Sequence, residues 1–148
     1  MLKFRDILPQ PPWKGLPIPR GLANKTKQRN PQGGITQAPF KVKSLDKSKE
    51  ITLTGIVDTG AIYSTIPTSA IEQLGLPQIG VTSLTLLDGR NVTARMFIGI
   101  MEIEGREIGT TFSSLGNGFI TIGVRDLEGL GFKVNPSTGK LEPTAILG

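Results

Sequence analysis

The residues best suited to chemistry follow a short apolar run, where Asp58 comes directly after Ile56-Val57 and is followed by Thr59-Gly60. Asp and Gly both favour turns, so an ordinary surface turn is one explanation of this tripeptide. The surrounding residues favour a different explanation, because turn carboxylates usually lie among polar residues and Asp58 lies between Ile56-Val57 and Ala61-Ile62. A carboxyl group placed there is partly withdrawn from water, which raises its pKa and suits it to acid–base catalysis.

Two residue types are missing from the 148-residue chain, which contains no cysteine and no histidine. Their absence excludes a disulfide framework, a thiolate nucleophile, a zinc finger, an HExxH metalloprotease helix and a Ser-His-Asp triad. Acid–base chemistry near neutral pH is therefore left to carboxylates, lysines and the single tyrosine, Tyr63.

Charge and proline divide the chain into two parts. Residues 1–49 hold 11 of the 17 basic residues and only two acids, a net charge of +9, whereas residues 50–148 carry 6 basic and 10 acidic residues, a net −4. Seven of the 11 prolines lie within residues 1–40, where they disfavour helices and central strands. We expect a basic, Pro-rich, partly disordered arm over residues 1–37 and one folded domain over residues 38–148.

Short β-rich runs separated by glycines follow the arm. Strands are expected at residues 40–43, 51–57, 62–66, 84–87, 91–96, 98–103, 107–112, 119–122, 132–134 and 140–142. Asp88-Gly89 and Glu104-Gly105-Arg106 are expected to form the turns of two hairpins. Short helices are expected at residues 68–74, with Thr68 as N-cap and Gly75 as the stop, and at residues 124–130. Many short strands with little helix indicate a compact all-β domain.

In order and spacing these elements resemble the retropepsin-like aspartic proteases over about residues 40–143. The motifs that match are the catalytic loop Asp58-Thr59-Gly60-Ala61, the flap Leu86-Leu87-Asp88-Gly89-Arg90, the following hairpin Glu104-Gly105-Arg106-Glu107-Ile108-Gly109-Thr110, the apolar-apolar-Gly element Ile120-Thr121-Ile122-Gly123 and Arg125-Asp126-Leu127. The resemblance implies an all-β, small closed β-barrel-like acid protease fold with a flap hairpin and one short C-terminal helix. The chain departs from viral members at Ile62, where they often carry an acid, and at the charged flap tip.

The resemblance also implies an aspartic endopeptidase that hydrolyses extended polypeptides. Such hydrolysis needs two carboxylates around one water molecule, one acting as base and one as acid. Because the chain has one Asp-Thr-Gly, we expect a homodimer in which Asp58 of each subunit meets its mate at a two-fold axis. We expect activity below neutral pH, and neither a cofactor nor a metal.

Other roles follow from the same resemblance. Thr59 would hydrogen-bond across the dimer axis, and Gly60 would let the backbone approach substrate closely. The residues expected to contact substrate are Ala61, Ile62, Leu87, Asp88, Gly89, Arg90, Phe119 and Thr121. Core packing is an equal alternative for Phe119 and the favoured one for Ile122. We expect Asp126 to cap or orient the C-terminal helix rather than to catalyse.

Two other classes of function stay open. A non-catalytic dimerisation or peptide-binding module can have the same fold. The basic arm allows weak, salt-sensitive nucleic-acid binding, or it can act as a prosegment lying in the cleft. No apolar stretch approaches the ~20 residues that span a bilayer, so no membrane contact is expected and the cytoplasm is the default location.

Overall fold

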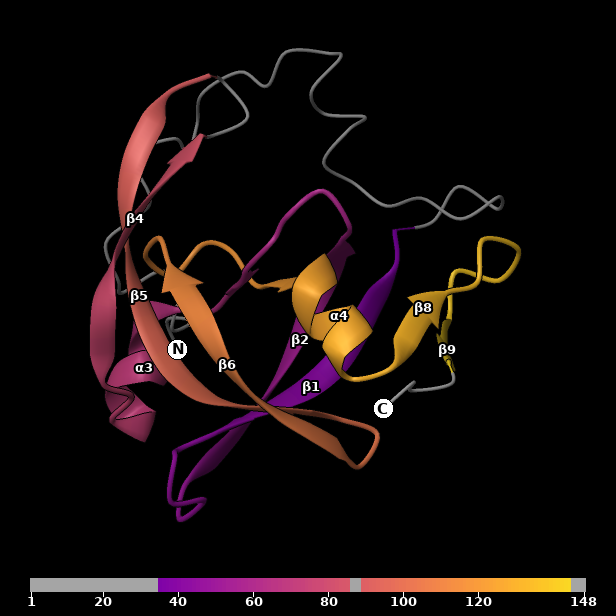
Figure 1. Cartoon of the computed structure of the whole chain (residues 1–148), viewed down its shortest axis with the longest axis horizontal. Helices are drawn as coiled ribbons and strands as arrows, with labels where there is room; N and C mark the ends of the chain where they lie inside the picture. The colour runs from indigo at the N-terminus through magenta and orange to yellow at the C-terminus, as the bar shows by residue number, and fades with distance from the viewer. Residues whose placement is uncertain (1–34, 86–88, 145–148) are drawn as a thin grey trace, which may run out of the picture.

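The computed structural model describes residues 35–85 and 89–144, most of which are in β-strands (Figure 1). The strands of the described part are β1 Gln37–Lys43, β2 Glu50–Asp58, β3 Ser64–Thr65, β4 Gln78–Thr85, β5 Asn91–Ile103, β6 Arg106–Ser114, β7 Thr121–Gly123, β8 Phe132–Val134 and β9 Leu141–Pro143. Its helices are α3 Thr68–Leu74 and α4 Val124–Gly129. This composition confirms the all-β class. Neither helix is long and apolar enough to cross a membrane.

One sheet closes on itself to form the barrel. Its strand order is β1-β2-β7-β3-β6-β5-β4, and an additional pairing of β1 with β5 joins the first strand to the last but one. That closing pairing is antiparallel and places Val42 opposite Met101. The closed, barrel-like acid protease fold is therefore confirmed, with β4 attached outside the ring along β5.

Alternation along the strands builds the core. In β1 the side chains of Ala38, Phe40 and Val42 are buried, while the intervening residues face outwards. A two-residue period of this kind places every second side chain on the inner face of a barrel. Ile122, expected to pack in the core, is fully buried there.

The β4–β5 hairpin confirms the predicted flap and is longer than the sequence indicated. Its two strands pair antiparallel from Gly80 opposite Met96 to Thr85 opposite Asn91. Figure 1 shows the hairpin extending from one side of the barrel. Of the predicted turn, Asp88 lies outside the described residues, and Gly89 has a φ of 87°, a conformation that favours glycine.

Helix α3 has the predicted bounds and the predicted end, but its N-cap differs. Gly75 terminates it in the left-handed conformation at φ 65°. The prediction of Thr68 as N-cap is wrong, because Pro67 occupies that position and no side chain caps the helix. The Thr68 hydroxyl instead contacts the Ser114 hydroxyl on β6 at 2.8 Å.

The predicted arm lies outside the described residues as far as residue 34. The described part begins at residue 35, and β1 starts at Gln37, the last residue assigned to the arm. The carbonyl of Thr36 accepts a hydrogen bond from the Val57 amide at 3.0 Å, which ties this segment to β2.

Candidate active site

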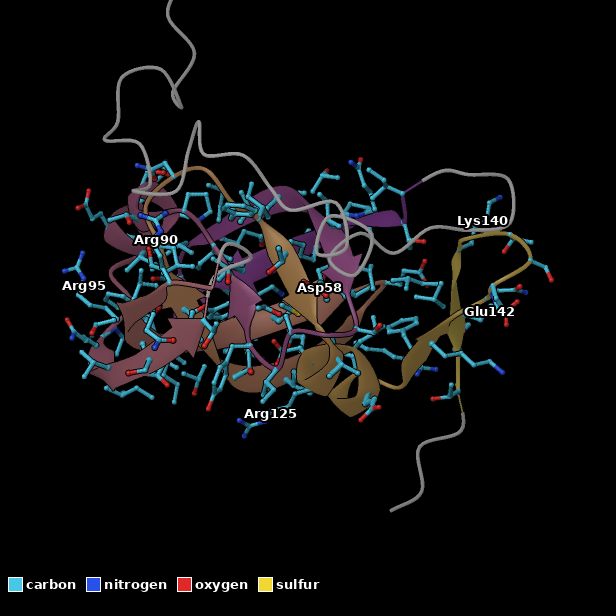
Figure 2. The ribbon with its side chains drawn as sticks, turned by 90° about the horizontal axis from the view of Figure 1, so that it is seen from above. Asp58, Arg90, Arg95, Arg125, Lys140 and Glu142 are labelled. Carbon is cyan, nitrogen blue, oxygen red and sulfur yellow. The ribbon has the colours of Figure 1, made fainter. Side chains whose placement is uncertain are left out.

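Asp58 is the last residue of β2, and the barrel places it beside the end of β7. The two strands run parallel, with Asp58 opposite Gly123 and Ile56 opposite Thr121. Figure 2 shows Asp58 near the middle of the molecule, between the flap side that carries Arg90 and Arg95 and the C-terminal β8–β9 hairpin. The topology therefore presents one carboxylate at the end of a central, well-supported strand.

Burial controls the ionisation of this carboxylate. Asp58 is partly buried, and its loss of contact with water raises its pKa. The amide of Gly60 donates a hydrogen bond to Asp58 Oδ1 at 3.0 Å, and the amides of Gly60 and Ala61 oppose the rise in pKa. No ion pair reaches Asp58 within the described residues. Asp58 therefore keeps its proton to higher pH than an ordinary aspartate does.

The loop after Asp58 is fixed from both sides. The Ala61 amide donates to the Asp58 carbonyl at 3.1 Å, which closes a tight turn, and the Ala61 carbonyl accepts from the Val124 amide at 2.9 Å. Gly123 packs directly against the loop, since a Cβ built on it would lie 2.6 Å from the Ile62 carbonyl oxygen. The loop is thus held against the junction of β7 and α4.

The predicted strand at residues 62–66 is reduced to Ser64–Thr65 because its first residues belong to this loop. Ile62 is 61% exposed despite its apolar side chain. Thr59 and Gly60 are also exposed, and Ala61 is partly buried. The loop therefore presents an isoleucine and two small residues next to Asp58.

The other residues predicted to bind substrate are distributed along the flap and near β7. Gly89 and Arg90 are exposed just before β5, whereas Leu87 and Asp88 lie outside the described residues. Phe119 is partly buried. The Thr121 hydroxyl accepts a hydrogen bond from the Thr65 amide at 3.3 Å, so it is engaged between β3 and β7. Figure 2 shows Arg90 displaced from Asp58 towards the flap side.

A buried polar group behind the loop was not predicted. Asp126, which is 1% exposed, accepts hydrogen bonds from the hydroxyls of Ser64 and Thr110. Of the two expected roles, capping α4 is wrong, because Gly123 is the N-cap and no side chain caps that helix, whereas orienting the helix is compatible with the two hydrogen bonds. Ser64 lies 62 residues from Asp126 in the chain, so no local sequence signal could have joined them.

A metal site is not found in the described residues, where no three His, Cys, Asp or Glu side chains gather closely enough to hold an ion. The chemistry that the described site offers is that of one partly buried carboxyl group with a raised pKa on a constrained loop.

Comparison with known protein families matches residues 41–115, about half of the chain, to the family described as aspartyl protease. The match includes β2, the Asp58 loop and the flap hairpin. No curated protein matches the chain. The chain belongs to the aspartyl protease family.

Proposed function

We propose that this chain is an aspartic endopeptidase that hydrolyses extended polypeptides as a homodimer, with one Asp58 from each subunit. The observation that carries the proposal is the placement of Asp58: partly buried at the end of β2, with a raised pKa, on a loop fixed by β7 and α4. Membership of the aspartyl protease family supports the same chemistry.

The need for a second subunit follows from the interactions of the other described acids, none of which is hydrogen-bonded to Asp58. Water activation by carboxylates takes two of them, one to accept a proton and one to donate. The carboxylate of Asp126 accepts hydrogen bonds from two hydroxyls, and Glu102 and Glu107 form ion pairs with Lys43. No described acid is hydrogen-bonded to Asp58, so its partner is assigned to the same residue of a second subunit.

In the proposed mechanism one Asp58 is ionised and its mate is protonated. The ionised carboxylate takes a proton from the bound water as the water oxygen attacks the peptide carbonyl carbon, while the protonated carboxyl gives its proton to the carbonyl oxygen. The C–N bond of the tetrahedral intermediate then breaks as the amide nitrogen takes the proton from the carboxyl that had received it from water, while the other carboxylate takes a proton from a hydroxyl of the intermediate. This step releases a carboxyl and an amine end and returns the pair to its starting state. Because two adjacent carboxylates share one proton, the pair titrates in two separated steps.

Exposure of the loop supports its role at a dimer axis. Thr59 and Gly60 are exposed in the single chain, so they can meet the corresponding loop of a second subunit. A Cβ on Gly60 would lie 3.3 Å from Asp58 Oδ1, and glycine therefore leaves the carboxylate accessible. Substrate would lie extended between this loop, with Ile62, and the flap.

The test is cleavage of an unfolded protein at acidic pH by the wild type and by Asp58→Asn. We expect the substitution to lower kcat by ~100-fold or more, because it removes the groups that transfer protons. The matched control is Glu128→Gln, which neutralises an exposed acid on α4 and should cleave normally. Cleavage that persists in Asp58→Asn contradicts the proposal. Peptide binding without cleavage by the wild type identifies a non-catalytic binding module instead.

A further inference from the structure

Asp126 is the one charged side chain among the described residues that is fully buried. It lies on α4, and none of the described ion pairs includes it. A buried carboxylate is costly unless hydrogen bonds replace its contacts with water. Here the replacement comes from two hydroxyls on two different strands, Ser64 on β3 and Thr110 on β6. The chain thus maintains a buried acid at a specific place behind the Asp58 loop.

Ser64 connects Asp126 to the Asp58 loop through hydrogen bonds. The Ser64 hydroxyl donates its proton to Asp126, which leaves the Ser64 oxygen free to act as an acceptor. The Ser64 oxygen then accepts from the Gly123 amide at 2.9 Å. Gly123 pairs with Asp58 and is in close contact with the Ile62 carbonyl. The hydrogen bond that the Ser64 hydroxyl donates to Asp126 and the one that the Gly123 amide donates to Ser64 therefore form a continuous connection that ends at the catalytic loop.

We propose that Asp126 is a positioning residue, which sets the place of Asp58 through Ser64 and Gly123 while Thr110 anchors its other oxygen to β6. Asp126 does not touch substrate or the reacting water in this role. The proposal rests on the proposed function for its kinetic consequences, and its structural consequence can be measured without any activity.

The first experiment measures kcat and KM for Ser64→Ala, Asp126→Asn and the control Glu128→Gln, with active sites counted by a tight-binding pepstatin-type inhibitor. A displacement of a catalytic group by about 1 Å can lower the reaction rate by about 100-fold. We therefore expect kcat per active site to fall about 10- to 100-fold in Ser64→Ala and Asp126→Asn, with KM within about 2-fold of the wild type. Glu128→Gln, on the same helix but exposed, should leave both constants unchanged.

A double variant shows whether Ser64 and Asp126 affect the Asp58 loop through one shared hydrogen bond or independently. Because Ser64 and Asp126 act through the same hydrogen bond, Ser64→Ala with Asp126→Asn should be no slower than the slower single variant. Losses that multiply indicate independent routes and contradict the proposal. Unchanged kcat per active site together with lower melting temperatures also contradicts it, because that result assigns Asp126 a role in stability alone.

The second experiment follows the titration of the Asp58 carboxyl carbon by NMR. A loosened loop admits water, so the pKa of Asp58 should fall towards its ordinary value in Ser64→Ala. That variant retains Asp126, so replacement of the Asp126 side chain cannot cause the fall. If the wild type proves inactive, this titration still tests the positioning role. If Asp126→Asn fails to fold, Ser64→Ala decides, and an Asp58 pKa equal to that of the wild type overturns the proposal.

Discussion

At the scale of single residues, the barrel places Asp58 where ionisation is unfavourable. Its pKa is raised by burial above the ordinary value of 3.8. The folded chain holds this proton more tightly than the unfolded chain does. The contribution of Asp58 to the free energy of unfolding is therefore greatest at low pH and is lost as the pH rises through the raised pKa. Catalytic groups commonly reduce stability in this way.

Asp58→Asn should therefore melt a few degrees above the wild type at neutral pH. At strongly acidic pH, where Asp58 is protonated in both states, the two melting temperatures should coincide. Thermal denaturation followed by circular dichroism across this pH range makes the comparison, with Glu128→Gln as the control for loss of an acid. An equal difference at both ends of the range would show that burial of the charge is not the cause.

Close packing at Gly123 supports a second prediction. A Cβ there would meet the Ile62 carbonyl oxygen at 2.6 Å and the Tyr63 carbonyl carbon at 2.7 Å, both of them backbone atoms that cannot rotate away. Gly123→Ala should therefore lower the free energy of unfolding by about 1–3 kcal/mol and reduce activity further than its stability loss explains.

Gly109→Ala is the matched control, because a Cβ at Gly109 would meet nothing within 4 Å. That variant should change the free energy of unfolding by no more than about 0.5 kcal/mol. Urea denaturation of both variants measures the two values. Equal stability of Gly123→Ala and Gly109→Ala would mean that the loop is not held against β7.

At the scale of elements, an ion-pair network joins the β1–β2 turn to the β5–β6 hairpin. Lys43 Nζ lies 2.8 Å from a Glu102 oxygen and 2.5 Å from a Glu107 oxygen, and Lys47 Nζ lies 2.8 Å from the other Glu107 oxygen. Hydrogen bonds from Lys43 and then Lys47 lower the pKa of Glu107 from its ordinary 4.5 to about 2. The contribution of Glu107 to the free energy of unfolding is present above pH 4.5 and is lost as the pH falls towards 2.

Glu107→Gln should accordingly be less stable than the wild type above pH 4.5, and the difference should shrink as the pH falls towards 2. Melting temperatures measured over this interval provide the test. Glu104→Gln, an exposed acid of the same hairpin, serves as control and should run parallel to the wild type. A deficit for Glu107→Gln that is constant with pH would rule out the network as its source.

The elements also show what the sequence could predict. Alternation along residues 51–57 and the Asp-Gly and Glu-Gly turns are local signals, and they located β2 and both hairpins. The bounds of α3 were predicted correctly, but its N-cap was not, because Pro67 supplies the extended entry and the Thr68 hydroxyl contacts Ser114 on β6. Such contacts depend on which strands become neighbours, and a local pattern does not contain that information.

The same limit applies to the candidate site. Asp58 was predicted from local signals, because Ile56-Val57 precede it directly and Ala61-Ile62 follow Thr59-Gly60. The connection through Ser64 and Asp126 joins residues 62 positions apart and exists only once β3, β7 and α4 have assembled. Ile62 shows the converse case: its apolar type predicts a strand, but the turn after Asp58 turns its side chain to solvent.

At the scale of the whole molecule, closure of the barrel brings together segments that the family match does not span. Residues 41–115 include Asp58, while β7 and α4, which support its loop, lie beyond them. The described single chain offers one Asp58 and no second carboxylate bonded to it. The arrangement is thus half of the proposed catalytic pair, and activity should depend on how subunits combine.

Mixing wild type with Asp58→Asn measures that dependence. After the two are unfolded together and refolded, random pairing gives a wild-type dimer fraction equal to the square of the wild-type share. An equal mixture should retain about a quarter of the activity of the same total amount of wild type. Mixing wild type with Glu128→Gln, the control for refolding yield, should retain full activity. A retained activity of about half at equal shares would mean that each chain cleaves by itself, because only that arrangement makes activity proportional to the number of intact Asp58 residues.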